Sequence, residues 1–77
     1  MTLDIISPEK TVYSGEAESV TLPGSLGLFT ILDRHAPIIS ALTKGTLIYS
    51  INGVKTEVKV NGGFVETINN NVSVCIE

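Results

Sequence analysis

The only histidine of the chain, His35, is the first candidate for catalytic chemistry, because Asp33 and Arg34 stand immediately before it. A Ser-His-Asp hydrolytic site needs a serine next to the histidine and a third group that orients the imidazole ring. No spacing in the sequence locates such a serine, and there is no Gly-x-Ser-x-Gly turn to position one. We therefore interpret His35 as a surface or turn histidine. A hydrolase would need a pocket that converges on this side chain.

Metal binding is even less well supported by the remaining ligand-type residues. His35 and Cys75 are each the only residue of their type, and their separation of forty positions matches no zinc-ligand spacing. Cys75 lies inside an apolar run and is most simply a small residue of a strand. Glu16 and Glu18 are expected on one strand face, pointing outward into solvent. The sequence therefore predicts no catalytic residue, no metal site and no cofactor.

The glycines of Pro-Gly-Ser-Leu-Gly, Pro23 to Gly27, suggest at first a phosphate-binding loop. A P-loop needs a lysine and a Ser or Thr that open a helix, whereas strand-type residues follow this segment. The Gly24-to-Gly27 spacing also fits the Gly-x-x-Gly loop of RNA-binding KH domains, but those need flanking helices and this chain is acidic. What remains is a turn-rich edge on a small scaffold, which is typical of a module that binds another protein.

Length and composition exclude several classes of function. Seventy-seven residues, 43% apolar and 17% charged, fit one globular domain over residues 1–77 with an aliphatic core. The net charge is −3 and the five Lys and Arg residues are scattered, so nucleic acid is not an expected partner. No apolar run approaches the roughly 18 residues of a membrane span, and MTLDIISPEK does not resemble a signal peptide. Together with the single cysteine, which cannot form an internal disulfide, these features indicate a soluble protein in a reducing compartment.

The elements that carry these residues are predicted to be strands throughout. Short runs rich in β-branched residues cover residues 3–6, 10–14, 18–22, 28–32, 38–42, 46–51, 54–60, 64–68 and 72–76. Asn52-Gly53 is the strongest hairpin signal, because both residues tolerate positive φ. No segment shows a helical stripe. The predicted fold is all-β, a small flattened, meandering β-sandwich or barrel of about eight to ten short, mostly antiparallel strands.

Alternation within three of these runs predicts which side chains are buried, because successive residues of a strand point to opposite faces. The expected buried sets are Val54, Thr56, Val58 and Val60; Leu47, Tyr49 and Ile51; and Val72, Val74 and Ile76.

The order of motifs from Leu3 to Glu77 resembles the epsilon subunit of F-type ATP synthases. The most specific parts are Leu3-Asp4-Ile5-Ile6-Ser7-Pro8, the Tyr13-Ser14-Gly15 corner, and the Gly24-to-Pro37 segment that ends in His35-Ala36-Pro37. Lys44-Gly45 and Asn61-Gly62-Gly63-Phe64 continue the likeness. Ordered motifs over nearly the whole chain are more specific than any one of them.

The resemblance implies a non-catalytic rotor subunit of the central stalk, which lies at the foot of the gamma shaft and on the membrane ring of c subunits. It implies a peripheral place on the cytoplasmic side of a bacterial energy-transducing membrane, without a small-molecule substrate. The residues expected to meet the c-ring are Gly24, Ser25, Leu26, Gly27 and Leu28. Those expected to meet gamma are Ser7, Arg34, His35, Ala36 and Pro37.

The sequence departs from the family pattern at three places. The Gly-rich loop often carries acidic residues in the family but contains Leu26 and Leu28 here, so we expect apolar contact with the ring. Asp33 stands where a proline is common. The family typically continues into a C-terminal helical hairpin, whereas this sequence stops at Glu77, so we expect the inhibitory hairpin to be absent.

A second hypothesis, from another class, is a lipoyl- or biotin-carrier domain, which is also all-β and of this size. Such domains present a lysine at a hairpin tip between characteristic neighbours such as Met-Lys-Met. Lys44 precedes Gly45 without those neighbours, and Lys55 and Lys59 fall inside a predicted strand.

Overall fold

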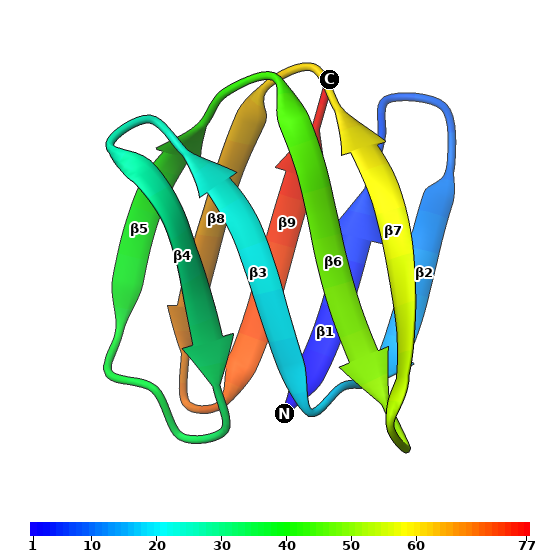
Figure 1. Cartoon of the computed structure of the whole chain (residues 1–77), viewed down its shortest axis with the longest axis vertical. Helices are drawn as coiled ribbons and strands as arrows, with labels where there is room; N and C mark the ends of the chain where they lie inside the picture. Colours follow the sequence, from blue (N-terminus) through cyan, green and yellow to red (C-terminus); the bar gives the residue numbers. More distant parts are fainter.

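The computed structural model describes all 77 residues, Met1–Glu77, and consists of nine β-strands without a helix (Figure 1). The strands are β1 (Thr2–Ile6), β2 (Thr11–Glu16), β3 (Ser19–Gly24), β4 (Gly27–Leu32), β5 (Ile38–Leu42), β6 (Gly45–Ile51), β7 (Val54–Val60), β8 (Gly63–Ile68) and β9 (Asn71–Ile76). Each predicted strand is present within two residues of its predicted bounds, which confirms the all-β class. No helix of the length and hydrophobicity needed to cross a membrane is present.

The strands form one sheet that curls over itself into two facing layers (Figure 1). The strand order is β2-β1-β9-β8-β5-β3-β6-β7, and β4 pairs with β3. One layer holds β4, β3, β6 and β7, and the other holds β5, β8, β9, β1 and β2. The layers are joined where Gly24 of β3 pairs with Leu42 of β5.

The prediction of a meander is wrong, although most strand pairs are antiparallel as expected. Consecutive strands form the hairpins β1–β2, β3–β4, β6–β7 and β8–β9. However, β3 also pairs with β6, β5 pairs with β8, and β1 runs parallel to β9. The first and last strands therefore lie side by side within one layer (Figure 1).

Two tight turns have the backbone conformation that their residue types predict. Asn52 and Gly53 join β6 to β7 with φ angles of 51° and 77°, and Asn69 and Asn70 join β8 to β9 with φ angles of 52° and 62°. Positive φ at both central residues gives a turn whose twist matches the twist of the flanking strands. The Asn52-Gly53 hairpin prediction is confirmed.

Fifteen buried apolar residues form one cluster between the layers. Leu3 and Ile5 of β1 are fully buried in it, as are Val20 and Leu22 of β3. The predicted sets are confirmed for Leu47 and Tyr49 of β6, beside which Ile51 is half-buried, and for Val72, Val74 and Ile76 of β9. Packing across the gap between layers includes Tyr13 of β2 and Tyr49, whose ring centroids lie 4.4 Å apart.

The predicted burial of β7 is correct only for its second half. Val60 is buried and Val58 is half-buried, but Val54 and Thr56 are exposed. Because β7 pairs only with β6, it is an edge strand, and its first half lies at the rim of the molecule (Figure 1). The alternating sequence pattern is therefore present in the first half of β7, but no opposite layer covers these side chains.

Candidate functional site

The β3–β4 hairpin presents two leucines at one end of the molecule. Gly24 pairs with Gly27, so Ser25 and Leu26 form the tip. Leu26 is fully exposed and Leu28, the second residue of β4, is 75% exposed. Of the five residues predicted to meet a ring of subunits, only Gly24 is buried.

Packing and backbone hydrogen bonds hold this hairpin in place. A Cβ atom at Gly24 would lie 2.7 Å from Cε1 of Phe29 and 2.9 Å from the carbonyl oxygen of Gly27. The backbone N–H of Ser25 donates to the carbonyl oxygen of Ala41 at 3.0 Å, and the N–H of Thr43 donates to that of Pro23 at 2.8 Å. The hairpin is thus hydrogen-bonded to β5 and to the β5–β6 connection, which together support its exposed leucines.

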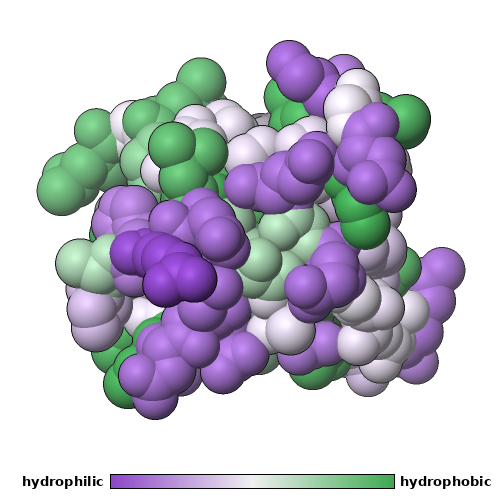
Figure 2. All heavy atoms as spheres, turned by 90° about the horizontal axis from the view of Figure 1, so that it is seen from below, coloured by the Kyte–Doolittle hydropathy of each residue, from purple (hydrophilic) through white to green (hydrophobic).

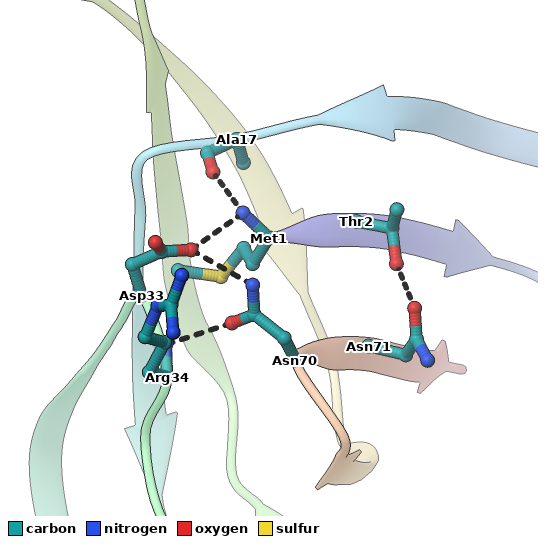
Figure 3. Close-up of polar contacts among 7 residues, drawn as sticks. All are labelled: Met1, Thr2, Ala17, Asp33, Arg34, Asn70 and Asn71. Carbon is teal, nitrogen blue, oxygen red and sulfur yellow. Dashed lines mark hydrogen bonds and ion pairs between the residues drawn. The ribbon is translucent and has the colours of Figure 1, made fainter.

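The connection from β4 to β5, which contains Asp33 to Pro37, lies at the opposite end of β4 (Figure 1). Polar contacts hold it (Figure 3). The Met1 ammonium group donates to Asp33 Oδ1 at 2.8 Å and to the carbonyl oxygen of Ala17 at 3.2 Å. Asn70 Nδ2 donates to Asp33 Oδ1 at 3.0 Å, and Asn70 Oδ1 accepts from the backbone N–H of Arg34 at 2.7 Å. The hydrogen bond from the ammonium group, and next that from Asn70, hold the pKa of Asp33 below its ordinary value.

The residues around His35 do not assemble a hydrolytic triad. The exposed imidazole donates from Nδ1 to the carbonyl oxygen of Ala36 at 2.7 Å. Asp33 is engaged with Met1 and Asn70 instead of the imidazole. The depression beside His35 is lined by Arg34, His35, Ala36, Pro37, Asn69 and Asn70, none of which is a serine, threonine or cysteine. Seen from below, the end of the molecule that carries the β4–β5 connection is mostly hydrophilic (Figure 2). Hydrophobic residues gather toward the left of this view, which is the side of β4 and β5.

Ser7 does not lie beside the other residues predicted to meet gamma. It forms the β1–β2 turn, where its N–H donates to the carbonyl oxygen of Lys10 at 2.9 Å. This turn is at the same end of the molecule as the β3–β4 tip, and Arg34 to Pro37 are at the other end (Figure 1). A partner that touches both must therefore extend along the length of a layer.

The glutamates predicted on one strand face are placed differently. β2 ends at Glu16, and Glu18 lies in the connection to β3, beyond the buried Ala17. Glu18 Oε1 accepts a hydrogen bond from the backbone N–H of Gly53 at 3.1 Å. The prediction failed because the strand ends between the two residues; both side chains are exposed as expected. No three His, Cys, Asp or Glu side chains come together as a metal site.

The lysines do not fit the carrier-domain hypothesis. Lys44 lies in the connection between β5 and β6, which are not paired with each other, so it is not at a hairpin tip. Lys55 and Lys59 lie within β7, as predicted.

Sequence reasoning missed a set of exposed apolar side chains on the layer that contains β1, β5 and β8. These are Ile6, Ile39, Phe64 and Ile68. The segment Phe-Val-Glu-Thr-Ile, residues 64–68, could have indicated this surface, because apolar residues occur on both faces of that strand. A strand with apolar side chains on both faces is typical of a sheet that is covered on both sides.

Comparison with known proteins shows that the whole chain matches one protein family. Residues 1–77 match the family described as ATP synthase, Delta/Epsilon chain, beta-sandwich domain. The chain is 44% identical over 73 residues to the ATP synthase epsilon chain of Desulfitobacterium hafniense, covering 95% of this chain and 55% of that protein. It is 40% identical over 74 residues to the epsilon chain of Leptospira borgpetersenii, covering 96% of this chain and 58% of that protein. The chain thus spans little more than half the length of these relatives.

Two solved structures share the fold. A chain of the Euglena gracilis mitochondrial ATP synthase, in a structure of its OSCP/F1/c-ring, superposes with a TM-score of 0.90 at 19% identity, covering 96% of this chain and 48% of that one. A chain of the Tetrahymena thermophila mitochondrial ATP synthase, in a structure of its central stalk and c-ring, gives 0.83 at 17% identity, covering 99% and 62%. Identities this low establish likeness of fold alone.

Proposed function

Because this chain belongs to the beta-sandwich domain family of ATP synthase delta and epsilon chains, we propose that it is a non-catalytic rotor subunit in the central stalk of an F-type ATP synthase. It links the gamma shaft to the ring of c subunits and so supports the coupling of proton flow to ATP synthesis. The observation that carries this proposal is the family match over residues 1–77, together with identities of 44% and 40% to epsilon chains.

In this proposal the β3–β4 hairpin, Gly24 to Leu28, faces the c-ring. Its support is the exposure of Leu26 and Leu28 on a hairpin that packing and backbone hydrogen bonds hold in place. No charged residue lies between Gly24 and Leu28, so contact with the ring is apolar and does not depend on ion pairs.

Ser7 and the segment Arg34 to Pro37 face gamma in the same proposal. Both are exposed or half-exposed turns that hydrogen bonds fix in place. His35 contributes to this contact and to no chemical step, because neither a nucleophile nor a free carboxylate accompanies it. The chain then lies peripherally on the cytoplasmic side of a bacterial membrane, as part of the complex.

Co-purification from native membranes tests the proposal. A tagged form of the complete polypeptide, expressed from its own gene, is expected to recover gamma and the catalytic subunits after mild detergent extraction. A strain with the untagged polypeptide is the control for nonspecific recovery. Absence of gamma and of the catalytic subunits from the tagged sample under mild salt would contradict the proposal.

A further inference from the structure

The chain contains two Asn-Gly bonds, Asn52-Gly53 and Asn61-Gly62. Asparagine is among the thermolabile residues of proteins. The backbone nitrogen of the residue that follows can attack the amide carbon of the asparagine side chain, and a glycine obstructs this approach least because it has no Cβ. The structure places these two identical dipeptides in different surroundings, so they should differ in reactivity.

The Asn52-Gly53 bond is held by its turn and by a neighbouring carboxylate. Asn52 and Gly53 form the turn between Ile51 and Val54, which are paired with each other, and the φ angle of Asn52 is 51°. The backbone N–H of Gly53 donates to Glu18 Oε1 at 3.1 Å. The nitrogen that would attack is therefore engaged in a hydrogen bond, and the turn would have to open locally before the reaction.

The Asn61-Gly62 bond lacks both constraints. It connects β7 to β8, which lie in different layers and are not paired with each other, so no hairpin register fixes its dihedral angles. The only backbone hydrogen bond of this connection runs from the N–H of Glu77 to the carbonyl oxygen of Gly62 at 3.1 Å, which leaves the Gly62 nitrogen free. Gly62 is buried, but Asn61 is exposed, so water reaches its side chain.

We propose that Asn61 is a site of spontaneous deamidation, and that Glu18 and the β6–β7 turn protect Asn52 from the same reaction. In the first step the Gly62 nitrogen loses its proton and bonds to Cγ of Asn61, and the side-chain amide leaves as ammonia. Water then opens the cyclic imide at either of its two carbonyl groups, which gives aspartate or isoaspartate at position 61. The reaction needs no enzyme and no oxidant, and this inference does not depend on the proposed function.

Both products add a negative charge at the end of the molecule that carries the β3–β4 hairpin (Figure 1). Gly63, which follows the reacting bond, pairs with Leu42 of β5, and Leu42 pairs with Gly24 of that hairpin. Isoaspartate also lengthens the backbone just before Gly63, where a Cβ atom would clash with the carbonyl oxygen of Cys75. Deamidation therefore changes both the charge and the backbone where β8 begins.

Incubation of the folded, complete polypeptide at mildly alkaline pH tests the proposal. Digestion after Lys and Arg places Asn52 and Asn61 on different peptides, because Lys55 and Lys59 lie between them. Mass spectrometry measures the conversion of each amide to an acid, and enzymatic methylation of isoaspartate identifies that product. The same protein unfolded in urea is the control, because both Asn-Gly bonds are then free of the contacts made by the fold.

In the folded protein Asn61 is expected to lose its amide several-fold faster than Asn52, and in urea the two rates should be similar. Glu18→Ala removes the acceptor of the Gly53 N–H, so it should raise the rate at Asn52 and leave the rate at Asn61 unchanged. Glu57→Ala is the matched control, because it removes an exposed carboxylate that forms no ion pair, and it should change neither rate. Circular dichroism verifies that each variant is folded.

Three outcomes would contradict this inference. Equal rates at Asn52 and Asn61 in the folded protein, or a faster rate at Asn52, would overturn the assignment of the site. The same difference between the two rates in urea would mean that neighbouring residues in the sequence, and not the fold, set the rates. A rate at Asn52 that Glu18→Ala leaves unchanged would show that protection of Asn52 by the Gly53 hydrogen bond is wrong.

Discussion

Two turn-rich segments lie at the two ends of β4, and different contacts hold them. At the Gly24 end, the ring of Phe29 fills the space beside the glycine, and the exposed residues are leucines. At the Asp33 end, an ammonium group and an asparagine hold an exposed carboxylate. Apolar packing does not change with pH, whereas the contacts of Asp33 depend on the ionisation of its carboxyl group. The two ends should therefore respond differently to substitution and to pH.

Gly24→Ala is expected to have the largest effect on stability. The added methyl group would lie within 2.9 Å of both the Phe29 ring and the carbonyl oxygen of Gly27, so the hairpin must shift. Overpacking of this kind costs about 1–3 kcal/mol. Urea unfolding of both proteins measures the loss. Adding Phe29→Leu should recover only part of it, because the clash with the Gly27 backbone remains.

An unchanged free energy of unfolding in Gly24→Ala would show that packing does not define the Gly24 end. Ser25→Ala, at the exposed tip of the same hairpin, is the control and should unfold like the wild type.

Asp33→Asn is expected to destabilise the protein less than Gly24→Ala does. The loss should occur only at pH values at which the wild-type carboxylate is ionised. The hydrogen bonds from the Met1 ammonium group and Asn70 lower the pKa of Asp33 from its ordinary value of 3.8. A carboxyl group with a lowered pKa stabilises the fold fully above that ordinary value. This contribution is lost as pH falls through the lower pKa of the folded state. Unfolding of both proteins at several pH values measures the difference between them.

The stability difference between wild type and Asp33→Asn should therefore be present at neutral pH and shrink in acid. Glu57→Gln on β7, which changes an exposed carboxylate that forms no ion pair, is the control variant measured at the same pH values. A difference that stays constant from neutral to acid pH would mean that the Asp33 end is not held by charge.

Leu28→Asp should change the free energy of unfolding by no more than about 0.5 kcal/mol, because exposed positions tolerate substitution. Leu28 is 75% exposed. If the β3–β4 hairpin meets the c-ring, ATP-driven proton pumping in membranes with the complete polypeptide should fall more than ATP hydrolysis. A large loss of stability, or an equal loss of both activities, would contradict an exposed coupling contact at this residue.

His35→Ala is expected to have the smallest effect. Its hydrogen bond to Ala36 is exposed, so the free energy of unfolding should stay within about 0.5 kcal/mol of the wild type. Assembly with gamma weakens at most slightly. An ester-hydrolysis assay of both purified proteins tests the absence of chemistry. An activity of the wild type that disappears in His35→Ala would overturn the non-catalytic proposal.

The sequence was enough to predict the strands and several turns. Alternation within β9 correctly predicted which of its side chains are buried, because that pattern depends only on the geometry of one strand. Asn52-Gly53 likewise predicted its own hairpin, because positive φ is a property of those two residues. The exposed Leu26 and the exposed His35 also agree with their placement in turns.

Only the tertiary structure decided how the strands are paired and which faces remain open. β1 and β9 lie side by side although they stand at opposite ends of the sequence, and no local pattern specifies that pairing. Ile5 is fully buried and Ile6 is 45% exposed, yet the two residues are chemically identical in the sequence. The hydrogen bond from the Met1 ammonium group to Asp33 likewise requires that two segments far apart in the sequence meet in the fold. Local periodicity determines which residues share a face, whereas burial of that face depends on the layer that the rest of the chain places against it.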